Sequence, residues 1–294
     1  MFETADKLWL RQVESSLRYH AVEFQWDGFE PRLTCVARGG DDVFDIDLGQ
    51  VDFVISDARE CVGYFDGDSY TSCPNKASVT RFAQCADCAG ESFIPFQECV
   101  FEPKCDGEIC DMDFCRRGHV LYLAFYDTKV KIGMSSTRRI ERRLIEQGAD
   151  AFAVVGTFPT RRRAREAEKH MSSRLRIPQA LRQEAVLSGF SKVVDAAGIE
   201  ERFHRLASSI VSQFGLKVEG LRWMDAYPID LPLDRTPRLR DAAGRHRGKL
   251  IGMKGKWLVY DSGSLNALNL WDVPSRFIDA DAPPGTSALR KIKK

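Results

Sequence analysis

Cysteine is the residue type whose spacing in this chain points most directly to chemistry. Seven of the nine cysteines lie within residues 73–115, and Cys85 and Cys88 form a C-x2-C pair. Two sulfurs at that spacing can leave one tight turn and reach the same ion, and structural Zn²⁺ takes four ligands in a tetrahedron. Enough candidate ligands are present for one or two structural zinc ions: Cys73, Cys85, Cys88, Cys99, Cys105, Cys110, Cys115 and His119.

Other interpretations of the thiols remain open at this point. Four of the clustered cysteines could hold an iron–sulfur cluster instead of zinc, and some could be buried thiols without any ligand. Cys35 and Cys61 lie outside the cluster in strand-like sequence, which favours buried thiols at those two positions. Zinc would act here on structure, because a loop-rich segment with few apolar residues can be folded by its metal.

Charge is distributed unequally along the chain. Residues 1–118 carry 11 basic and 23 acidic side chains, whereas residues 119–294 carry 32 basic and 19 acidic ones. The basic excess is densest in residues 129–182, with 14 basic against 5 acidic side chains. This asymmetry predicts an anionic partner for the second half, with nucleic acid as the first candidate, unless the acidic half neutralises it internally.

Arginines gather on two expected helices, at about 137–147 and 161–175. Those expected to contact a phosphate backbone are Arg138, Arg139, Arg142, Arg161, Arg162, Arg163 and Arg165. Arg143 would project beside a buried stripe on the first helix, and Glu168 would lie at the edge of the apolar face of the second. Such an arginine could stabilise charge developing on a phosphate, and such a carboxylate could hold a divalent cation. Both could equally be surface ion-pair partners.

Apolar periodicity predicts an α+β protein with several parts. We expect a β-rich N-terminal region at 1–72 and a Cys-rich zinc-binding module at 73–118. A small sheet with flanking helices follows at 119–178, including a hairpin through Asp127 and Thr128. Helices and then strands fill 179–283, before a flexible basic tail at 284–294. The strand-rich N- and C-terminal regions could pair into one barrel-like body.

The second half also resembles a known superfamily of enzymes. The pattern V-L-Y-L, K-I-G, R-x-I-x-x-R-L and A-x-x-x-E in residues 120–168 is similar to the GIY-YIG nucleases, in the branch where lysine replaces the second motif tyrosine. The resemblance implies a small sheet with flanking helices that cleaves phosphodiesters by in-line attack of an activated water, with Mg²⁺ or Mn²⁺. The matching residues, implied to be catalytic, are Tyr122, Lys131, Arg143 and Glu168.

A closer resemblance covers residues 73–170. The cysteine run, E-P-x-C, H-x-x-Y-L-A, K-x-G and R-x-x-E-Q-G-A are similar to an uncharacterised family that places a zinc-ribbon-like module before the same core. Residues 252–255 and 269–270 resemble its C-terminal strand motifs. That family implies a second C-x2-C pair, but Tyr70 stands three positions before Cys73. The first metal site has therefore lost a ligand or recruited Cys61.

Departures from the nuclease pattern bear on catalysis. The first motif lacks its glycine, and Lys131 can act as a base only if its pKa is strongly lowered. His119 or Tyr126 are alternative bases. Gly133 is expected to let the chain leave its strand and enter the helix that carries the arginines.

Three functions are therefore compatible with the sequence. The first is metal-dependent phosphodiester hydrolysis on DNA or RNA, and the second is nucleic-acid binding without catalysis. The third is an enzyme whose basic site takes a small anionic or guanidino-type substrate. Without a signal-peptide pattern or an apolar run long enough to span a bilayer, we expect a soluble cytoplasmic protein with no membrane partner. The sequence does not indicate an oligomeric state.

Overall fold

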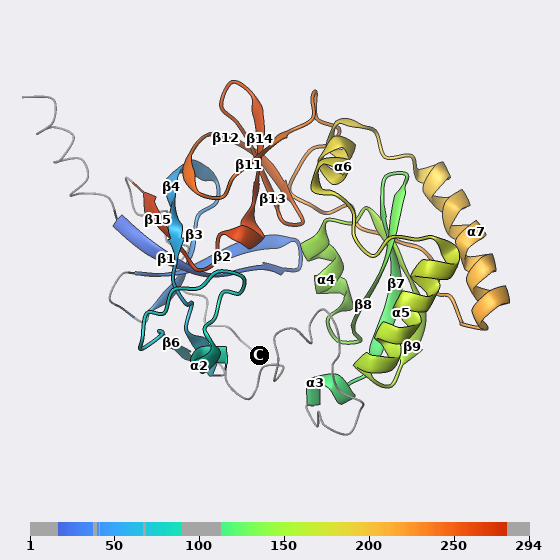
Figure 1. Cartoon of the computed structure of the whole chain (residues 1–294). Coiled ribbons are helices and arrows are strands. Elements are labelled where there is room, and N and C mark those ends of the chain that lie inside the picture. The colour runs from blue at the N-terminus through green and yellow to red at the C-terminus, as the bar shows by residue number, and fades with distance from the viewer. Residues whose placement is uncertain (1–16, 38–39, 41, 67–68, 90–112, 281–294) are drawn as a thin grey trace, which may run out of the picture. The chain divides into compact units, whose positions relative to one another are not determined.

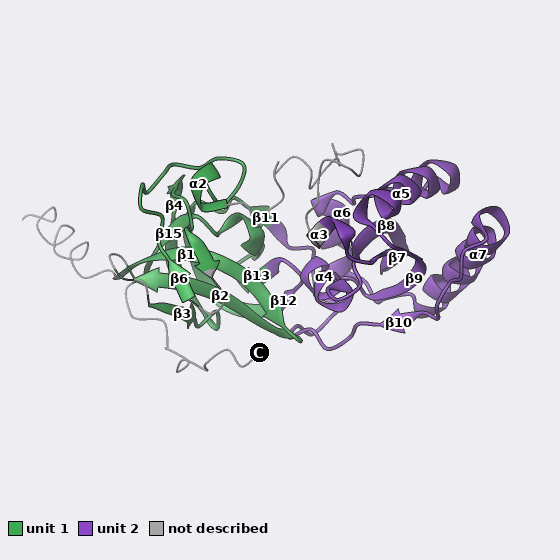
Figure 2. Cartoon of the chain, turned by 90° about the horizontal axis from the view of Figure 1, so that it is seen from below, with its two compact units in different colours: residues 1–90, 239–252, 258–294 green, residues 91–238, 253–257 purple. Residues whose placement is uncertain are grey.

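The computed structural model describes residues 17–37, 40, 42–66, 69–89 and 113–280. Two compact units divide the chain (Figure 2). Unit 1 consists of residues 1–90, 239–252 and 258–294, and unit 2 consists of residues 91–238 and 253–257. The chain therefore enters unit 1, passes to unit 2 and returns, and the mixed α+β class predicted from the sequence is confirmed.

A nine-stranded sheet forms the framework of unit 1, in the order β11-β14-β13-β12-β4-β15-β1-β2-β3 (Figure 1). Its N-terminal strands are β1 (Leu17–Asp27), β2 (Glu30–Ala37), β3 (Val43–Ile46) and β4 (Gln50–Arg59). Its C-terminal strands are β11 (Arg238–Arg240), β12 (Gly244–Lys254), β13 (Trp257–Asp261), β14 (Leu265–Asn269) and β15 (Arg276–Ala280). The short 3₁₀ helix η3 spans Leu270–Asp272.

Strands from the two ends of the described chain pair directly in this sheet. β15 lies between β1 and β4, with Tyr19 opposite Ile278 on one side and Ile55 opposite Ile278 on the other. The alternating pattern of β4 gives one buried face, as expected for a strand covered on one side. The expectation that N- and C-terminal strands pair is therefore confirmed.

The part of unit 1 that follows β4, residues 60–89, contains four cysteines, and we call it the cysteine segment. It contains the hairpin of β5 (Tyr64–Asp66) and β6 (Ser69–Thr71), and the short helix α2 (Ala86–Ala89). Gly63 starts the hairpin with a φ of +72°, and a Cβ there would lie 2.1 Å from the Thr71 carbonyl oxygen. Backbone bonds from Cys61 N to Ala77 O and from Val62 N to Ala83 O hold the loops together. This close approach of backbones requires glycine at position 63.

A four-stranded antiparallel sheet in the order β10-β9-β7-β8 forms the centre of unit 2. Its strands are β7 (His119–Tyr126), β8 (Lys129–Ser136), β9 (Ala151–Phe158) and β10 (Arg222–Trp223). The helices are α3 (Asp113–Arg116), α4 (Ile140–Gln147), α5 (Arg161–Leu175), α6 (Gln183–Leu187), the 3₁₀ helix η2 (Ser188–Ser191) and α7 (Ala196–Phe214).

The two faces of this sheet differ in chemistry. One face carries Leu121, Leu123 and Phe125 of β7 into the core that α5 and α7 cover (Figure 1). The opposite face carries Tyr122 of β7 and, across the β7–β8 ladder, Gly133 and Lys131. Side chains alternate along a strand, so the sequence L-Y-L-A-F-Y places its two leucines and its phenylalanine on one face and its two tyrosines and its alanine on the other.

The structure corrects several boundaries expected from the sequence. The sequence L-K-V-E-G-L-R-W at 216–223 predicts a strand, but among these residues only Arg222–Trp223 pair, as β10. Strand β14 stops at Asn269, whose side chain caps η3 by accepting from Trp271 N. Gly133 lies inside β8 rather than at its end. No described helix is long and apolar enough to cross a membrane.

Candidate functional site

Four thiols of unit 1 form a cluster with the dimensions of a metal site. The Sγ atoms of Cys61, Cys73, Cys85 and Cys88 all lie within 4.8 Å of one another, and those of Cys73 and Cys85 are 3.9 Å apart. A tetrahedron with Zn–S bonds of about 2.3 Å has S–S edges of about 3.8 Å. The four thiols could therefore hold a metal ion such as zinc, and we call them the thiol cluster.

The protein environment of the thiol cluster favours anionic sulfur at some positions and opposes it at others. The Cys61 sulfur accepts hydrogen bonds from Gly63 N at 3.4 Å and Cys85 N at 3.2 Å. Burial nevertheless raises the pKa of Cys61 and of Cys88. Burial also opposes ionisation of Cys73, but backbone N–H groups of nearby residues outweigh it and lower the pKa of that thiol. A divalent cation would supply the charge that lets all four ionise together.

The remaining predicted zinc ligands are not part of this cluster. Cys99, Cys105 and Cys110 lie outside the described residues. Cys115 lies in α3 of unit 2, and His119 begins β7 with its Nδ1 2.7 Å from the Arg117 carbonyl oxygen. A second zinc site involving these residues stays a prediction.

The residues predicted to be catalytic all lie in unit 2, and the first of them, Tyr122, packs against Gly133. These two residues are opposite each other on β7 and β8. A Cβ on Gly133 would lie 2.5 Å from the Tyr122 hydroxyl oxygen and 2.6 Å from Cζ, so the ring lies across the glycine. The glycine of K-I-G is therefore required by close packing of the tyrosine, and not by a turn into the helix.

Helix α4 brings Arg143 and Gln147 to the same tyrosine. The Gln147 amide nitrogen donates to the Tyr122 hydroxyl at 3.2 Å, and the Tyr126 hydroxyl donates to the Gln147 amide oxygen at 3.4 Å. Arg143, one turn earlier on the same helix face, also hydrogen-bonds Tyr122. Burial raises the pKa of Tyr122, so its hydroxyl is held as a neutral, oriented group.

Lys131 lies on β8, opposite Ala124 and 5.7 Å from the centre of the Tyr126 ring. Burial, and after it the positive charges of Arg143 and Lys256, lower the pKa of Lys131 to about 8. Glu168 acts in the opposite direction on the same ammonium group. At neutral pH a minor but substantial fraction of Lys131 is therefore unprotonated.

Glu168 completes the group from helix α5. Its carboxylate is buried and pairs closely with Arg165, which also donates to the Gln179 side chain at 3.0 Å. Burial raises the pKa of Glu168, and the positive charges of Arg165, Lys131 and Arg161 lower it by a smaller amount. Glu168 also interacts electrostatically with Tyr122. We call Tyr122, Lys131, Arg143, Gln147, Arg165 and Glu168 the polar cluster.

The arginines predicted to bind nucleic acid differ in their surroundings. Glu146, buried on α4, pairs with Arg139 at 3.2 Å and Arg142 at 3.1 Å, and lies 4.0 Å from Arg143. Arg162 pairs with Glu166 at 2.9 Å, and Arg161 is buried. Arg138 and Arg163 are exposed. Much of the expected basic surface is therefore locally balanced by carboxylates.

A turn of the C-terminal hairpin, residues 253–257, belongs to unit 2 and reaches the same region. A Cβ on Gly255 would lie 2.5 Å from Gly148 N and 2.7 Å from the Gln147 carbonyl carbon. Lys254 is buried, pairs with Asp150, and lies 5.3 Å from the Tyr227 ring centre. The turn is therefore wedged against the C-terminal end of α4, and it carries Lys256.

Sequence reasoning missed two kinds of residue. Cys61 was favoured as a buried thiol, although recruitment to the metal site was an open alternative. Gln147 and Lys256 were not considered, and for Gln147 the signal was its i+4 spacing from Arg143 on one helix face. Lys256 lies 88 or more residues from every member of the polar cluster, so no local pattern connects it to them.

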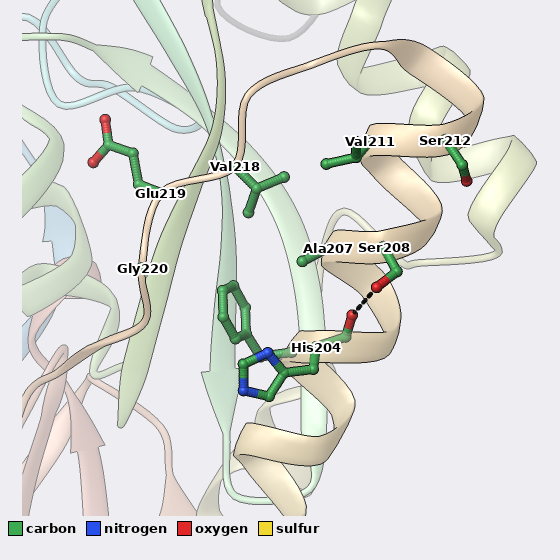
Figure 3. A pocket seen from close by; sticks show the side chains of 9 residues that line it. His204, Ala207, Ser208, Val211, Ser212, Val218, Glu219 and Gly220 are labelled. Atoms are coloured by element: carbon green, nitrogen blue, oxygen red, sulfur yellow. Dashed lines mark hydrogen bonds between the residues drawn. The ribbon is translucent and has the colours of Figure 1, made fainter.

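A hollow in another part of unit 2 has no residue in common with the polar cluster. It lies between α7 and residues 218–220, with Ala207, Val211 and Val218 among its lining side chains (Figure 3). The Ser208 hydroxyl at its edge donates to the His204 carbonyl oxygen at 2.9 Å. The polar cluster and not this hollow contains the convergent titratable groups that mark functional sites.

Comparison with protein families gives one match. Residues 49–273 match a family described as a protein of unknown function, DUF2797, and this match covers more than half of the chain. The chain belongs to the DUF2797 family. The DUF2797 match spans the thiol cluster, the polar cluster and Lys256. No curated protein and no solved structure matches the chain.

Proposed function

We propose that unit 2 binds the phosphate backbone of a nucleic acid and hydrolyses a phosphodiester bond. The observation that carries the proposal is that Tyr122, Lys131, Arg143 and Glu168, which come from four elements within 47 positions of sequence, act on one another electrostatically. Cations and a poised base around one phosphate are the groups that phosphoryl transfer uses, because that chemistry depends on positioning and charge stabilisation.

Each member of the polar cluster has a role in this proposal. Arg143, 40% of whose side chain is exposed, binds the phosphate and stabilises the charge that develops on its oxygens. Unprotonated Lys131 accepts a proton from water as the water oxygen bonds to phosphorus and the P–O bond to the leaving sugar oxygen breaks. Tyr122, oriented by Gln147, donates its hydroxyl hydrogen bond toward the reacting phosphate. The leaving oxygen takes its proton from solvent.

Glu168 is the residue that would hold Mg²⁺ or Mn²⁺. It supplies one buried carboxylate, and Arg165 already neutralises it. Mg²⁺ in such sites uses one or two carboxylates together with substrate phosphates and water, so the residues fit a cation that arrives with the substrate. When bound there, the cation would polarise the phosphate oxygens.

The thiol cluster has a structural role in the same proposal. We propose that one Zn²⁺ is bound by Cys61, Cys73, Cys85 and Cys88, which fits the tetrahedral spacing of their sulfurs. All four positions are taken by protein ligands, so this zinc has no open position for substrate. A closed site of this kind acts on folding.

Binding without catalysis is the second candidate function. It is favoured by the burial of Tyr122 and by the close pairing of Glu168 with Arg165, which leave these groups satisfied within the protein. Arg138 and Arg163 are exposed and could still contact a phosphate backbone.

A cleavage assay separates these functions. Labelled DNA and RNA are incubated with Mg²⁺ or Mn²⁺ and with wild-type protein, Arg143→Ala, Glu168→Gln or the control Arg174→Ala, an exposed arginine of α5. We expect cutting that falls at least about 100-fold in the first two variants and is unchanged in the control. Salt-sensitive binding without cutting would establish the second function. Absence of both would leave a small anionic substrate as the remaining candidate.

The pH dependence tests the role of Lys131. A base must be unprotonated, so the rate should rise with pH and level off above about 8, where Lys131 has lost its proton. A Lys131→Gln variant should lose this rise as well as most of the rate. A wild-type rate that is flat between pH 6 and 9 would contradict the assignment of Lys131 as the base.

A further inference from the structure

The guanidinium group of Arg165 contacts two acceptors of different kinds. Its Nη1 donates to the Glu168 carboxylate, one helical turn later on α5, and to the Gln179 side-chain oxygen at 3.0 Å. An Nη atom carries two hydrogens, so one can go to each acceptor. Among the residues that the structure describes, Arg165 is the side chain that hydrogen-bonds Glu168. The Glu168 side chain is only 5% exposed, so its carboxylate meets this cation largely out of reach of water.

Gln179 is held in place by the loop that follows α5. Ile177 is buried in the core of unit 2, and its backbone N donates to the Ser172 carbonyl oxygen at 3.0 Å. The Ser172 hydroxyl donates in turn to the Ile177 carbonyl oxygen at 2.7 Å. The carbonyl oxygen of Pro178 accepts from Ile132 N of β8 at 3.0 Å. Because the loop is fixed at these two residues, Gln179 has a defined position from which it contacts Arg165.

The pairing with Arg165 opposes a second cation at the same carboxylate. Glu168 is the residue proposed to hold Mg²⁺ or Mn²⁺, and a divalent cation that approaches it meets the positive charge of Arg165. The guanidinium therefore has to leave the carboxylate before the cation can bind well. Gln179 can keep its hydrogen bond to the displaced group, because that contact does not involve the carboxylate. A neutral amide oxygen holds a guanidinium less strongly than a carboxylate does, so Arg165 returns when the cation leaves.

We propose that Arg165 controls the access of the divalent cation to Glu168. Its guanidinium occupies the carboxylate in the free protein and stays on Gln179 alone once the cation binds. The inference rests on the proposed function, which takes Glu168 as the cation ligand. Arg165 and Gln179 act through Glu168, so both are positioning residues. Removal of Arg165 should then strengthen cation binding, whereas loss of an ordinary structural ion pair would not.

Mn²⁺ alone is the probe, added to the full chain while the free ion is measured by its electron paramagnetic resonance signal. Wild-type protein is compared with Arg165→Met, which keeps much of the apolar stem and removes the charge. We expect Arg165→Met to bind Mn²⁺ at least about tenfold more tightly, a coupling of ordinary size between two ligands of one group. Glu168→Gln should lose this binding. The matched control is Arg205→Met, which breaks an exposed pair with Glu201 on α7 and should leave Mn²⁺ affinity unchanged.

Gln179→Ala tests the same exchange in a variant that keeps the ion pair. The displaced guanidinium then has lost its second acceptor, so Mn²⁺ affinity should fall a few-fold. Gln213→Ala, which removes an exposed glutamine of α7, should be unchanged. This variant keeps the inference testable if Arg165→Met does not fold, since removing one partner of a buried pair is destabilising.

Thermal unfolding supplies a readout that a purely structural role of Arg165 would not move. A ligand stabilises the folded state more as its concentration exceeds the dissociation constant by a larger factor. A fixed concentration of Mn²⁺ should therefore raise the unfolding temperature of Arg165→Met more than that of the wild type. A purely structural role would lower the unfolding temperature by the same amount with and without Mn²⁺.

The outcomes distinguish this inference from the proposed function. Mn²⁺ affinity in Arg165→Met that is equal to or weaker than in the wild type overturns the inference, and so does equal affinity in Gln179→Ala and wild type. A tightening that persists in the double variant Arg165→Met with Glu168→Gln also overturns it, since the ion would then lie elsewhere. Oligonucleotide cleavage that requires Glu168, with any of these results, retains the proposed function alone. Tightening that requires Glu168, in a protein that cuts no oligonucleotide, supports the inference and removes the proposed catalysis.

Discussion

The thiol cluster and the polar cluster assemble distant residues in two different ways. In the thiol cluster four like groups meet within 4.8 Å, and nothing among them compensates four negative charges. In the polar cluster the Glu168 carboxylate is already paired with Arg165, and the Tyr122 hydroxyl already has a hydrogen bond from Gln147. The first arrangement needs an external ion to be stable in ionised form, whereas the second is stable by itself and can accept a ligand by exchanging partners.

The largest expected effect comes from removing the zinc ion that we propose for unit 1. Chelation, or Cys85→Ser, should release one equivalent of zinc and unfold the cysteine segment, because structural zinc contributes about 10 kcal/mol or more of apparent binding free energy in small domains. Zinc content and the unfolding transition are measured together. Cys35→Ala is the matched control, since Cys35 is buried in β2 outside the cluster. Chelation that releases no zinc, or that leaves the unfolding transition unchanged, would contradict the statement that the thiol cluster needs an external ion.

Breaking an internal ion pair should destabilise unit 2 by the next largest amount. Lys254→Met leaves the Asp150 carboxylate without its buried cation, which typically costs about 3–5 kcal/mol of unfolding free energy. The double variant Lys254→Met with Asp150→Asn should recover part of this loss, since no uncompensated charge remains. Denaturant unfolding of the three proteins measures the difference. If the double variant loses as much unfolding free energy as the two single variants together, the ion pair between Lys254 and Asp150 is not the cause of the loss.

The contact between Gly133 and Tyr122 should have an intermediate effect. Gly133→Ala places a Cβ about where the Tyr122 ring lies, and overpacking of this kind costs about 1–3 kcal/mol. The loss should be smaller in a Tyr122→Ala background, where the ring is absent. Gly189→Ala is the control, because a Cβ there meets no atom within 4 Å. If the losses of unfolding free energy from the Gly133 and Tyr122 substitutions were additive, contact with the Tyr122 ring would not explain why glycine is required at position 133.

Releasing arginines from Glu146 should have the smallest effect. Glu146→Gln removes the carboxylate that pairs with Arg139 and Arg142, both of which are partly exposed. We expect a loss of unfolding free energy of about 1 kcal/mol, because such pairs are screened by solvent. If unit 2 binds nucleic acid, affinity at low salt should rise a few-fold, as two cations become available. Fluorescence anisotropy over a salt series measures this, and weaker binding would contradict it.

The sequence was informative where a single element carried the signal. Helix α5 has the predicted bounds, 161–175, because its apolar positions recur at helical spacing and Thr160 caps the helix by accepting from Arg163 N. Cys85 and Cys88 were assigned to a metal site from spacing alone. The α+β class followed from the same local patterns.

The sequence was less informative where distant segments meet. Strand β15, which pairs between β1 and β4, was not predicted because its R-F-I-D-A sequence is short and its partners are more than 200 residues away. Cys61 belongs to the thiol cluster, and a hydrogen bond from Cys61 N to Ala77 O ties its backbone to the segment that carries Cys73. No local sequence pattern predicts this contact. Lys256 acts electrostatically on Lys131 from 125 positions away in sequence, and it follows Gly255, which packs against the end of α4.

The position of β15 has a consequence for how this protein is made. Ribosomes release a chain from its N-terminus, so β1 and β4 emerge long before residues 276–280, which pair with both of them. During that interval residues 113–238 of unit 2 are synthesised, and their strands β7, β8 and β9 pair with close neighbours in sequence. Most of unit 2, all but residues 253–257, can therefore fold on the ribosome while β1 and β4 still have unpaired edges. Those edges are exposed to aggregation and to chaperones until translation brings the last strand.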